Sequence, residues 1–168
     1  MNIDTFNSLD KTALTDALTK CCGSTRWVTE LCRRHPFKDE KTLFEKARKT
    51  WFERCGREDW LEAFAHHPKI GDVDSLAKKY AVTKDWAGKE QSGVRSASTA
   101  TLQALASGNE AYEQKFGYIF IVCATGKSAA EMLELLTQRL GNEPENELRT
   151  AMQEQHKITE IRLRKIGC

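Results

Sequence analysis

The chain has 168 residues, of which 40% are hydrophobic and 30% are charged, and its formal net charge at pH 7 is +2. These values are typical of one soluble globular domain that is long enough to bury a sizeable core. Basic and acidic residues alternate along the chain and do not gather into a basic stripe, so we expect no nucleic-acid partner.

Targeting signals are not found in the sequence. The first fourteen residues lack a charged segment followed by an apolar one, which argues against a secretory signal. The longest strongly apolar run, residues 118–124, is too short to cross a bilayer. The last five residues match neither a peroxisomal tripeptide nor a prenylation box. We therefore expect a cytoplasmic protein that does not associate with membranes.

Six cysteines are present, and without a secretory signal they favour reduced thiols over disulfides. No C-x-x-C pair exists, which argues against a zinc ribbon or a thioredoxin-type motif.

Apolar residues at helical spacing predict four helices in the first part of the chain. The first is capped by Ser8 or Asp10 and stopped by Gly23, and the second starts from Ser24 and ends near His35. The expected ranges are 8–22, 24–35, 39–55 and 58–66.

The second part of the chain continues this helical pattern. We expect a short helix at 74–80, a long helix from Ser96 or Ser98 to 116–117, a helix between Ser128 and Gly141, and a last helix that Pro144 starts. Residues 118–124 look strand-like but have no partner for a sheet, so a buried extended or helical segment is expected. The whole chain, 1–168, is thus predicted to form a single compact all-α domain of about seven to eight helices with irregular loops.

The stretch from His66 to Asp72 combines two imidazoles, a proline, a glycine and a carboxylate at the end of a predicted helix. Pro68 disfavours the α conformation of the preceding residue, so His67 should face outward from a helix terminus. Histidine can give or take a proton near neutral pH, which makes His67 a candidate acid or base. A purely structural role for His67, as for His35 before its own proline, fits the residue type about equally well.

Two other interpretations of nearby motifs are weaker. His66, His67, Asp72 and Asp74 could bind a metal ion, but adjacent histidines rarely face one ion and no H-x-x-x-H spacing exists. The sequence Ala124–Ser128 resembles the end of a P-loop but lacks the first glycine, so a turn followed by a serine helix cap is favoured.

Polar residues further along the chain are ambiguous. Glu90 and Gln91 could orient a substrate rich in N–H and C=O groups, although a solvated loop pair is the simpler interpretation. Arg162 could bind an anion, or it could simply belong to a basic helix end.

Taken in order, the motifs HHPKIGD, EQSG, YEQKFGYIFIVCA, RLGN and E-x-x-K-I-x-x-x-R-L resemble those of the OHCU decarboxylase family. This family acts on 2-oxo-4-hydroxy-4-carboxy-5-ureidoimidazoline, late in the oxidation of urate to (S)-allantoin. The resemblance extends from Phe6 to Leu163.

The resemblance implies an all-helical fold, a decarboxylation that needs no cofactor or metal, and a homodimer with a small-molecule ureidoimidazoline substrate. It marks His67 and Glu90 as catalytic. It also assigns substrate binding to Pro68, Ala87, Gln91, Ile119, Phe120, Ile121, Val122, Cys123 and Arg162. At Ala87 the family often has serine, so one hydroxyl contact to the substrate is expected to be absent or replaced.

Two other functions remain compatible with the residues alone. One is a metal-dependent hydrolase that uses His66, His67 and Asp72. The other is a helical interaction module without catalytic activity.

Overall fold

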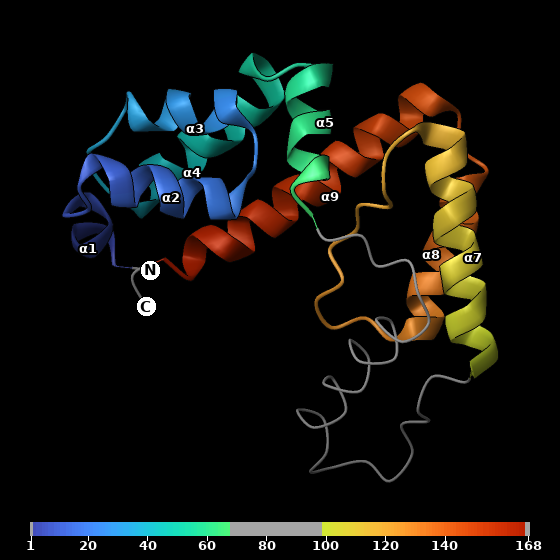
Figure 1. Cartoon of the computed structure of the whole chain (residues 1–168). Coiled ribbons are helices and arrows are strands. Elements are labelled where there is room, and N and C mark those ends of the chain that lie inside the picture. Colours follow the sequence, from blue (N-terminus) through green and yellow to red (C-terminus); the bar gives the residue numbers. More distant parts are fainter. Residues whose placement is uncertain (1, 68–98, 167–168) are drawn as a thin grey trace, which may run out of the picture. The chain divides into compact units, whose positions relative to one another are not determined.

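The structure is a computed structural model that describes residues 2–67 and 99–166 (Figure 1). Within these ranges all regular secondary structure is helical, with eight α-helices and one π-helix, which confirms the predicted all-α fold. The chain divides into two compact units. Residues 1–67, 121–123 and 150–168 form the first, and residues 68–120 and 124–149 form the second.

The first unit contains most of the N-terminal helices. They are α1 (Ile3–Asn7), α2 (Lys11–Cys21), α3 (Thr25–Cys32), α4 (Glu40–Lys49), the π-helix η1 (Thr50–Arg54), α5 (Arg57–Ala65) and the C-terminal part of α9 (Pro144–Arg164).

Helix caps explain where these elements begin. Asp10, and not Ser8, caps α2, because its carboxylate accepts hydrogen bonds at 2.9 Å from the backbone N–H groups of Thr12 and Ala13. Ser24 caps α3 as predicted. The separate short helix α1 was not predicted, and the predicted helix 39–55 ends in the π-helical turn η1.

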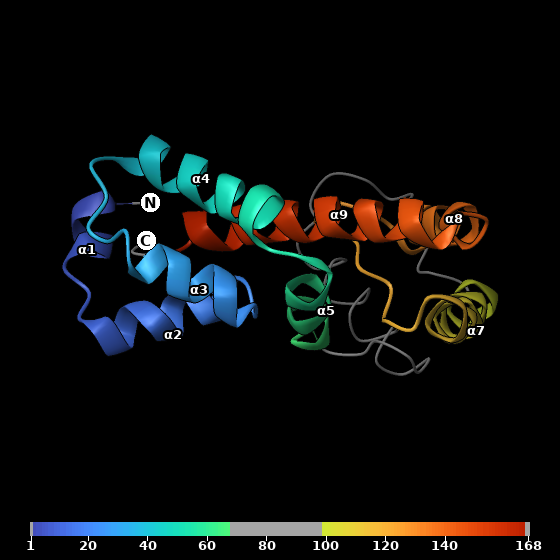
Figure 2. The ribbon, with the colours of Figure 1, turned by 90° about the horizontal axis from the view of Figure 1, so that it is seen from above.

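Three tryptophan indoles tie the first unit together through backbone carbonyls. Trp27 Nε1 donates to Ala47 O at 3.0 Å, Trp51 Nε1 donates to Met152 O at 2.9 Å, and Trp60 Nε1 donates to Trp51 O at 3.2 Å. Trp27 and Trp51 are almost completely buried. Each indole therefore contributes a large apolar surface and satisfies its one polar atom inside the core. Helix α3 packs against α2, α4, η1 and α5 in this unit (Figures 1 and 2).

In the second unit α7 (Thr99–Phe116) packs along α8 (Ala129–Leu140). Lys115, near the end of α7, donates to the carbonyl of Leu140 at the end of α8, at 2.6 Å. The two helices therefore run in the same direction, and a parallel pair needs a connection that returns along its length. Residues 117–128 form neither a helix nor a strand, so the predicted apolar segment 118–124 is not helical.

The motif Ala124–Ser128 is a turn followed by a helix cap, as the sequence favoured. Ser128 caps α8, and its N–H and hydroxyl group donate to the carboxylate of Glu131 at 2.7 and 2.8 Å. Pro144 is the first residue of α9, also as predicted. The predicted helix 74–80 and the caps Ser96 and Ser98 lie outside the described residues.

The described residues bear on two expectations, reduced cysteines and the lack of a membrane-spanning helix. The five cysteines among them are free thiols, and burial raises the pKa of Cys21 and Cys22 to about 12, which makes both thiols unreactive near neutral pH. None of the helices that the described residues form combines the length and apolar character needed to span a bilayer.

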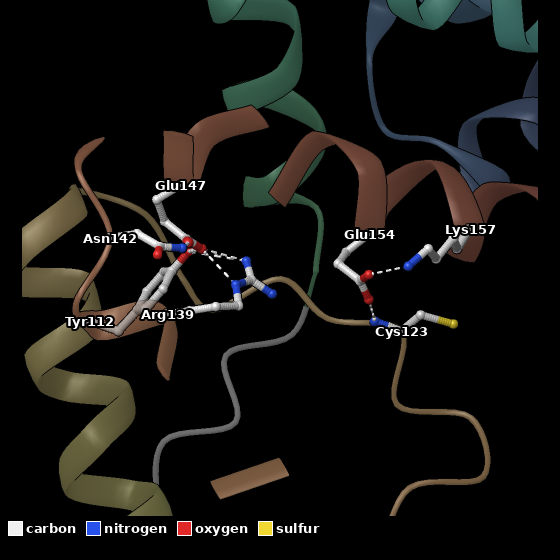
Figure 3. Close-up of polar contacts among 7 residues, drawn as sticks. All are labelled: Tyr112, Cys123, Arg139, Asn142, Glu147, Glu154 and Lys157. Carbon is white, nitrogen blue, oxygen red and sulfur yellow. Dashed lines mark hydrogen bonds and ion pairs between the residues drawn. The ribbon is translucent and has the colours of Figure 1, made fainter. Parts of the chain in front are cut away.

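A buried polar cluster lies within the second unit and involves Tyr112, Arg139, Asn142 and Glu147 (Figure 3). The Glu147 carboxylate is inaccessible to solvent and accepts from Arg139 Nε at 2.8 Å, from Asn142 Nδ2 at 2.6 Å and from the Tyr112 hydroxyl group. Burial and the bond to Glu147 raise the pKa of Tyr112, so its phenol remains a hydrogen-bond donor. Arg139 and Asn142 belong to the RLGN motif, and Tyr112 is the first residue of YEQKFGY. These motif residues therefore have a structural use in the buried cluster.

Removing the cation of this cluster should destabilise the fold. The substitution Arg139→Met leaves the Glu147 carboxylate buried without its ion-pair partner, and we expect the free energy of unfolding in urea to fall by about 3–5 kcal/mol. The double substitution Arg139→Met/Glu147→Gln should recover part of this loss, because no unpaired charge remains. Arg149 is exposed on the same helix as Glu147, and Arg149→Met is the matched control. Equal free energies of unfolding for Arg139→Met and the control Arg149→Met would contradict a structural role for the ion pair.

Candidate functional site

His67 lies two residues beyond the end of α5, next to the C-cap His66, and its backbone is held to the last turn of the helix. Its backbone N–H donates to Phe64 O at 3.1 Å. Helix α5 is tied to the start of α3 because Glu62 accepts from the Thr25 backbone N–H at 2.9 Å and from its hydroxyl group at 2.5 Å. His66 is exposed and His67 is half-buried, so the two adjacent histidines occupy different environments.

The imidazole of His67 contacts a buried amide on α9. His67 Nε2 lies 2.6 Å from Gln155 Oε1, and Gln155 is inaccessible to solvent. Gln155 Nε2 in turn donates to Thr159 Oγ1 at 3.3 Å. The Thr159 hydroxyl group lies within hydrogen-bond distance of two carbonyl oxygens, Gln155 O at 3.0 Å and Cys21 O at 3.4 Å.

The surroundings of His67 favour its neutral form. Burial lowers the pKa of His67, and the positive charge of Arg162 lowers it further, while the hydrogen bond with Gln155 acts in the opposite direction with a smaller effect. The resulting pKa lies below the ordinary value of about 6.5. The lowered pKa therefore favours the neutral imidazole, the form that can accept a proton.

The other described histidines outside this stretch have packing roles. The His35 ring contacts the rings of Phe6 and Phe37 at centroid distances of 6.0 and 6.4 Å. The His156 ring lies 4.9 Å from the ring of Phe52, and its Nε2 is 3.5 Å from a carboxylate oxygen of Glu160.

The residue before Gln155 holds the predicted substrate-lining segment. Glu154 Oε2 accepts from the backbone N–H of Cys123 at 2.8 Å, and its other oxygen accepts from Lys157 Nζ at 2.5 Å (Figure 3). Consecutive residues of α9 therefore fix two predicted parts of the site within the first unit. Glu154 fixes the backbone at Cys123, and Gln155 fixes the imidazole of His67.

The predicted segment Ile119–Cys123 is divided between the two units. Ile121, Val122 and Cys123 belong to the first unit, and Ile121 and Cys123 are buried there. Phe120 belongs to the second unit, where its ring centroid lies 5.1 Å from that of Tyr112 and 4.6 Å from Arg139 Cζ. The aromatic side chain at position 120 therefore contributes to the packing around the buried ion pair.

Arg162 contacts the C-terminal end of α2. Its Nη1 donates to Lys20 O at 3.2 Å and to Cys21 O at 3.4 Å, where a helix exposes unpaired carbonyl oxygens and a partial negative charge. The structural alternative had placed Arg162 on a basic face at the end of its own helix, whereas the observed contact is with the end of α2. The effect of Arg162 on the pKa of His67 nevertheless brings its charge into the electrostatic environment of the imidazole.

Several predicted site residues lie outside the described residues: Pro68, Asp72, Asp74, Ala87, Glu90 and Gln91. The described residues contain no cluster of three or more histidine, cysteine, aspartate or glutamate side chains that could hold a metal ion.

Sequence reasoning did not single out Glu154, Gln155 or Thr159, which the structure connects to predicted site residues. Gln155 and Thr159 are buried, yet their polarity suggests an exposed helix face. One signal was present in the four-residue spacing of Ala151, Gln155, Thr159 and Leu163, which places them on one face of a helix. Ala151 and Leu163 are apolar and buried, which indicates that this face is buried.

With this geometry established, comparison with known proteins identifies the family. The model of the family described as OHCU decarboxylase matches residues 7–164. The chain belongs to the OHCU decarboxylase family. The match spans all the motifs from which the resemblance was inferred.

Relatives of known name agree with this assignment. The chain is 38% identical over 146 residues to the uric acid degradation bifunctional protein TTL of Arabidopsis thaliana, and the match covers 87% of the chain and 45% of that protein. The chain thus spans less than half the length of this relative. It is 27% identical over 164 residues to the 2-oxo-4-hydroxy-4-carboxy-5-ureidoimidazoline decarboxylase of Haloferax volcanii, with 97% of the chain and 94% of that protein covered.

A solved structure has the same fold. The crystal structure of an OHCU decarboxylase in the presence of (S)-allantoin superposes with a TM-score of 0.72 at 36% identity, covering 90% of this chain and 96% of that chain. An (S)-allantoin synthase structure superposes with a TM-score of 0.70 at 18% identity, which supports the fold alone.

The position of His66 should be sensitive to a single methyl group. A Cβ atom added to Gly23 would lie 2.2 Å from His66 Cγ and 2.4 Å from His66 Cβ, so Gly23→Ala must displace the His66 backbone or ring. We expect Gly23→Ala to lower the free energy of unfolding by about 1–3 kcal/mol, as overpacking does, and to shift the NMR signals of His66 and His67. Gly56→Ala is the control, since a methyl group at Gly56 would meet no atom within 4 Å. Unchanged histidine signals in Gly23→Ala would contradict the close packing.

Proposed function

We propose that this chain catalyses the decarboxylation of 2-oxo-4-hydroxy-4-carboxy-5-ureidoimidazoline to (S)-allantoin and CO2, in the degradation of urate, with His67 as the acid–base residue. The observation that carries the proposal is the half-buried imidazole of His67, which lies 2.6 Å from Gln155 and has a lowered pKa, in a chain of the OHCU decarboxylase family. The named relatives, which act in uric acid degradation or on this substrate, support the same reaction.

The chemistry of this substrate requires little beyond proton transfer. Its carboxylate is attached to a carbon that also bears a hydroxyl group and lies beside an imine-like ring carbon. When the C–C bond to the carboxylate breaks, CO2 leaves and the bonding electron pair passes into the ring. The hydroxyl-bearing carbon then becomes a carbonyl, and a proton must be added to one face of the neighbouring ring carbon, which bears the ureido group, to give a single enantiomer. No redox step occurs, and the reaction needs neither an electron acceptor nor an organic cofactor.

His67 suits both proton transfers. In its neutral form it accepts the proton of the substrate hydroxyl group, and as an imidazolium it donates a proton to the neighbouring ring carbon, which bears the ureido group. The lowered pKa of His67 places the neutral, accepting form at the start of the cycle. One imidazole on one side of the substrate would also explain the stereoselective product.

The remaining predicted residues are assigned supporting roles in this proposal. Glu90 would orient the imidazole or bind the ureido N–H groups, and Gln91, Pro68 and Ala87 would line the substrate. The backbone of Ile119–Cys123 would face the polar atoms of the ring, with its conformation fixed by the bond from Cys123 N–H to Glu154.

Arg162 is proposed to stabilise the anionic substrate through its charge. Part of its guanidinium group is already bound to α2 carbonyls. A limited interaction with the substrate suits this reaction, because a fully neutralised carboxylate loses CO2 more slowly.

We further propose that the whole chain, 1–168, acts as one domain, forms a homodimer and works in the cytoplasm without a metal or cofactor. The family resemblance supports the homodimer and the chemistry without a metal or cofactor. Sedimentation equilibrium measures the mass that decides the dimer, and activity after exhaustive chelation separates this enzyme from a metal-dependent hydrolase.

Replacement of His67 should abolish catalysis without unfolding the chain. The unstable substrate is generated from urate with the two upstream enzymes, and (S)-allantoin is followed by circular dichroism. We expect the wild-type chain to accelerate its appearance and His67→Asn to lose at least about 100-fold of that acceleration, the usual range for a general acid–base group. His35→Asn is the matched control, because His35 packs against phenylalanine rings. No acceleration by the wild-type chain would overturn the proposed function, and full activity of His67→Asn would remove His67 from it.

The rate should fall on the acid side of neutrality. A proton-accepting His67 is active when unprotonated, and its pKa lies below about 6.5. We therefore expect kcat/KM to be constant around pH 7–8 and to decrease as pH falls through that lowered pKa, as read from a pH–rate profile in which far-UV circular dichroism confirms an intact fold. A rate that rises as pH falls would contradict the role of neutral His67 as the initial base.

A further inference from the structure

We propose that Gln155, oriented by Thr159, acts as a positioning residue that fixes His67 in the tautomer protonated at Nε2, so that Nδ1 is the nitrogen that exchanges the catalytic proton. This inference deepens the proposed function and rests on it for the catalytic role of Nδ1. The tautomer itself is a property of the folded chain and is measurable without substrate.

The chain of donors and acceptors starts at Thr159. A threonine hydroxyl group carries one hydrogen, and here two carbonyl oxygens, Gln155 O at 3.0 Å and Cys21 O at 3.4 Å, lie in position to accept it. When that hydrogen is directed at either carbonyl, a lone pair of Oγ1 remains for the amide of Gln155. The hydroxyl group of Thr159 therefore acts as an acceptor toward Gln155.

The orientation of the Gln155 amide follows from this. Its NH2 group is the half that can donate, so it faces Thr159 Oγ1 at 3.3 Å, and its carbonyl oxygen faces His67. Rotating the amide by 180° would place the Gln155 carbonyl oxygen against Thr159 Oγ1 and would require the Thr159 hydroxyl group to give up its carbonyl partner. Gln155 and Thr159 are both almost completely buried, so water cannot easily replace a lost partner.

The tautomer of His67 is the last step. An amide oxygen accepts only, and it lies 2.6 Å from Nε2, so Nε2 must carry a hydrogen. This holds for the neutral imidazole and for the imidazolium. The Nε2 proton thus remains in place through the catalytic cycle, while Nδ1 is unprotonated in the neutral form and gains and loses the proton.

The choice of an amide as the partner also has an electrostatic consequence. The described charged or titratable groups that act on His67 are Arg162 and His66, and both lower its pKa. A carboxylate in place of Gln155 would hold the same tautomer but would favour the imidazolium. Gln155 fixes the direction of the ring and leaves the imidazole neutral.

The direct test is an NMR measurement of the tautomer. Long-range ¹H–¹⁵N correlation spectra of the uniformly ¹⁵N-labelled full chain are recorded at pH 8, and His67→Asn assigns the His67 signals. We expect Nε2 of His67 to show a pyrrole-type ¹⁵N shift and Nδ1 a pyridine-type shift. The opposite pattern, with Nδ1 carrying the hydrogen, would overturn the inference whether or not the chain is active. A chain with the expected tautomer but no decarboxylase activity would overturn the proposed function and leave the tautomer assignment standing.

Variants at Thr159 test the origin of the tautomer. Thr159→Val removes the hydroxyl group at nearly constant shape, so the Gln155 amide loses its fixed orientation and the His67 signals should move toward a mixture of tautomers. We expect kcat to fall roughly tenfold or more, a part of the contribution of a general base, with a smaller change in KM. Thr159→Ser retains the hydroxyl group and should restore both the tautomer and kcat.

Gln155→Met provides a second variant that fills similar space without an acceptor oxygen. It should also mix the tautomers and lower kcat. Unaltered His67 shifts and an unaltered kcat in Gln155→Met would show that another group sets the tautomer and would overturn the role of Gln155.

Discussion

Buried polar groups on α9 impose the main constraint on this structure. Glu147, Gln155 and Thr159 are almost inaccessible to solvent, and a polar group without a partner in such surroundings costs roughly 1–3 kcal/mol, more if it is charged. Each group therefore requires a partner from elsewhere in the chain. Glu147 obtains Arg139, Tyr112 and Asn142 in the second unit, while Gln155 obtains His67 in the first.

These pairings place the candidate catalytic groups. The side chain of His67 follows a helix end, where local structure alone would leave it many rotamers, and its short contact with a buried amide restricts them. The neighbouring residue on α9, Glu154, restrains the backbone at Cys123 by a charge-assisted hydrogen bond. A single helix thus provides rigid attachment points for both the proposed acid–base residue and the segment proposed to face the substrate. Sites that are held by rigid elements in this way keep their reactive groups in productive geometry.

Local sequence chemistry predicted much of the fold. Asp10, Ser24 and Ser128 cap the helices that follow them, because a side-chain oxygen before an apolar periodic run has one dominant use in a helical protein. Helix α1 was missed because five residues are too short to show a periodicity. The π-helical turn η1 was missed because its residues have the same apolar spacing as an α-helix.

The sequence predicted some residues of the candidate site and not others. His67 could be singled out because a proline and a helix end follow from nearest neighbours in the sequence. The spacing of Gln155 and Thr159 with Ala151 and Leu163 could place them on a buried helix face, but it could not name the partner of Gln155, which lies 88 residues away. The role of Arg162 was left undecided by sequence, and its contacts with α2 carbonyls arise from tertiary packing that no local pattern encodes.

Other motifs that could have indicated a functional site have a structural use instead, and this contrast favours His67 as the functional residue. The P-loop-like residues before α8 are accounted for by a turn and a helix cap, and His35 is accounted for by its phenylalanine neighbours. His67 differs from both, because the contact with Gln155 engages one ring nitrogen and orients the other.

An amide partner also suits the proposed chemistry better than the carboxylate found in Ser–His–Asp triads. There the aspartate stabilises an imidazolium that forms beside a neutral substrate group. A decarboxylase must instead keep its substrate carboxylate ionised and weakly held until CO2 departs, and a standing imidazolium would bind that carboxylate and slow the step. Burial and the charge of Arg162 keep His67 neutral, and Gln155 orients it without adding a negative charge that would reverse this balance. The same hydrogen bond thus supplies orientation while the site remains suited to losing CO2.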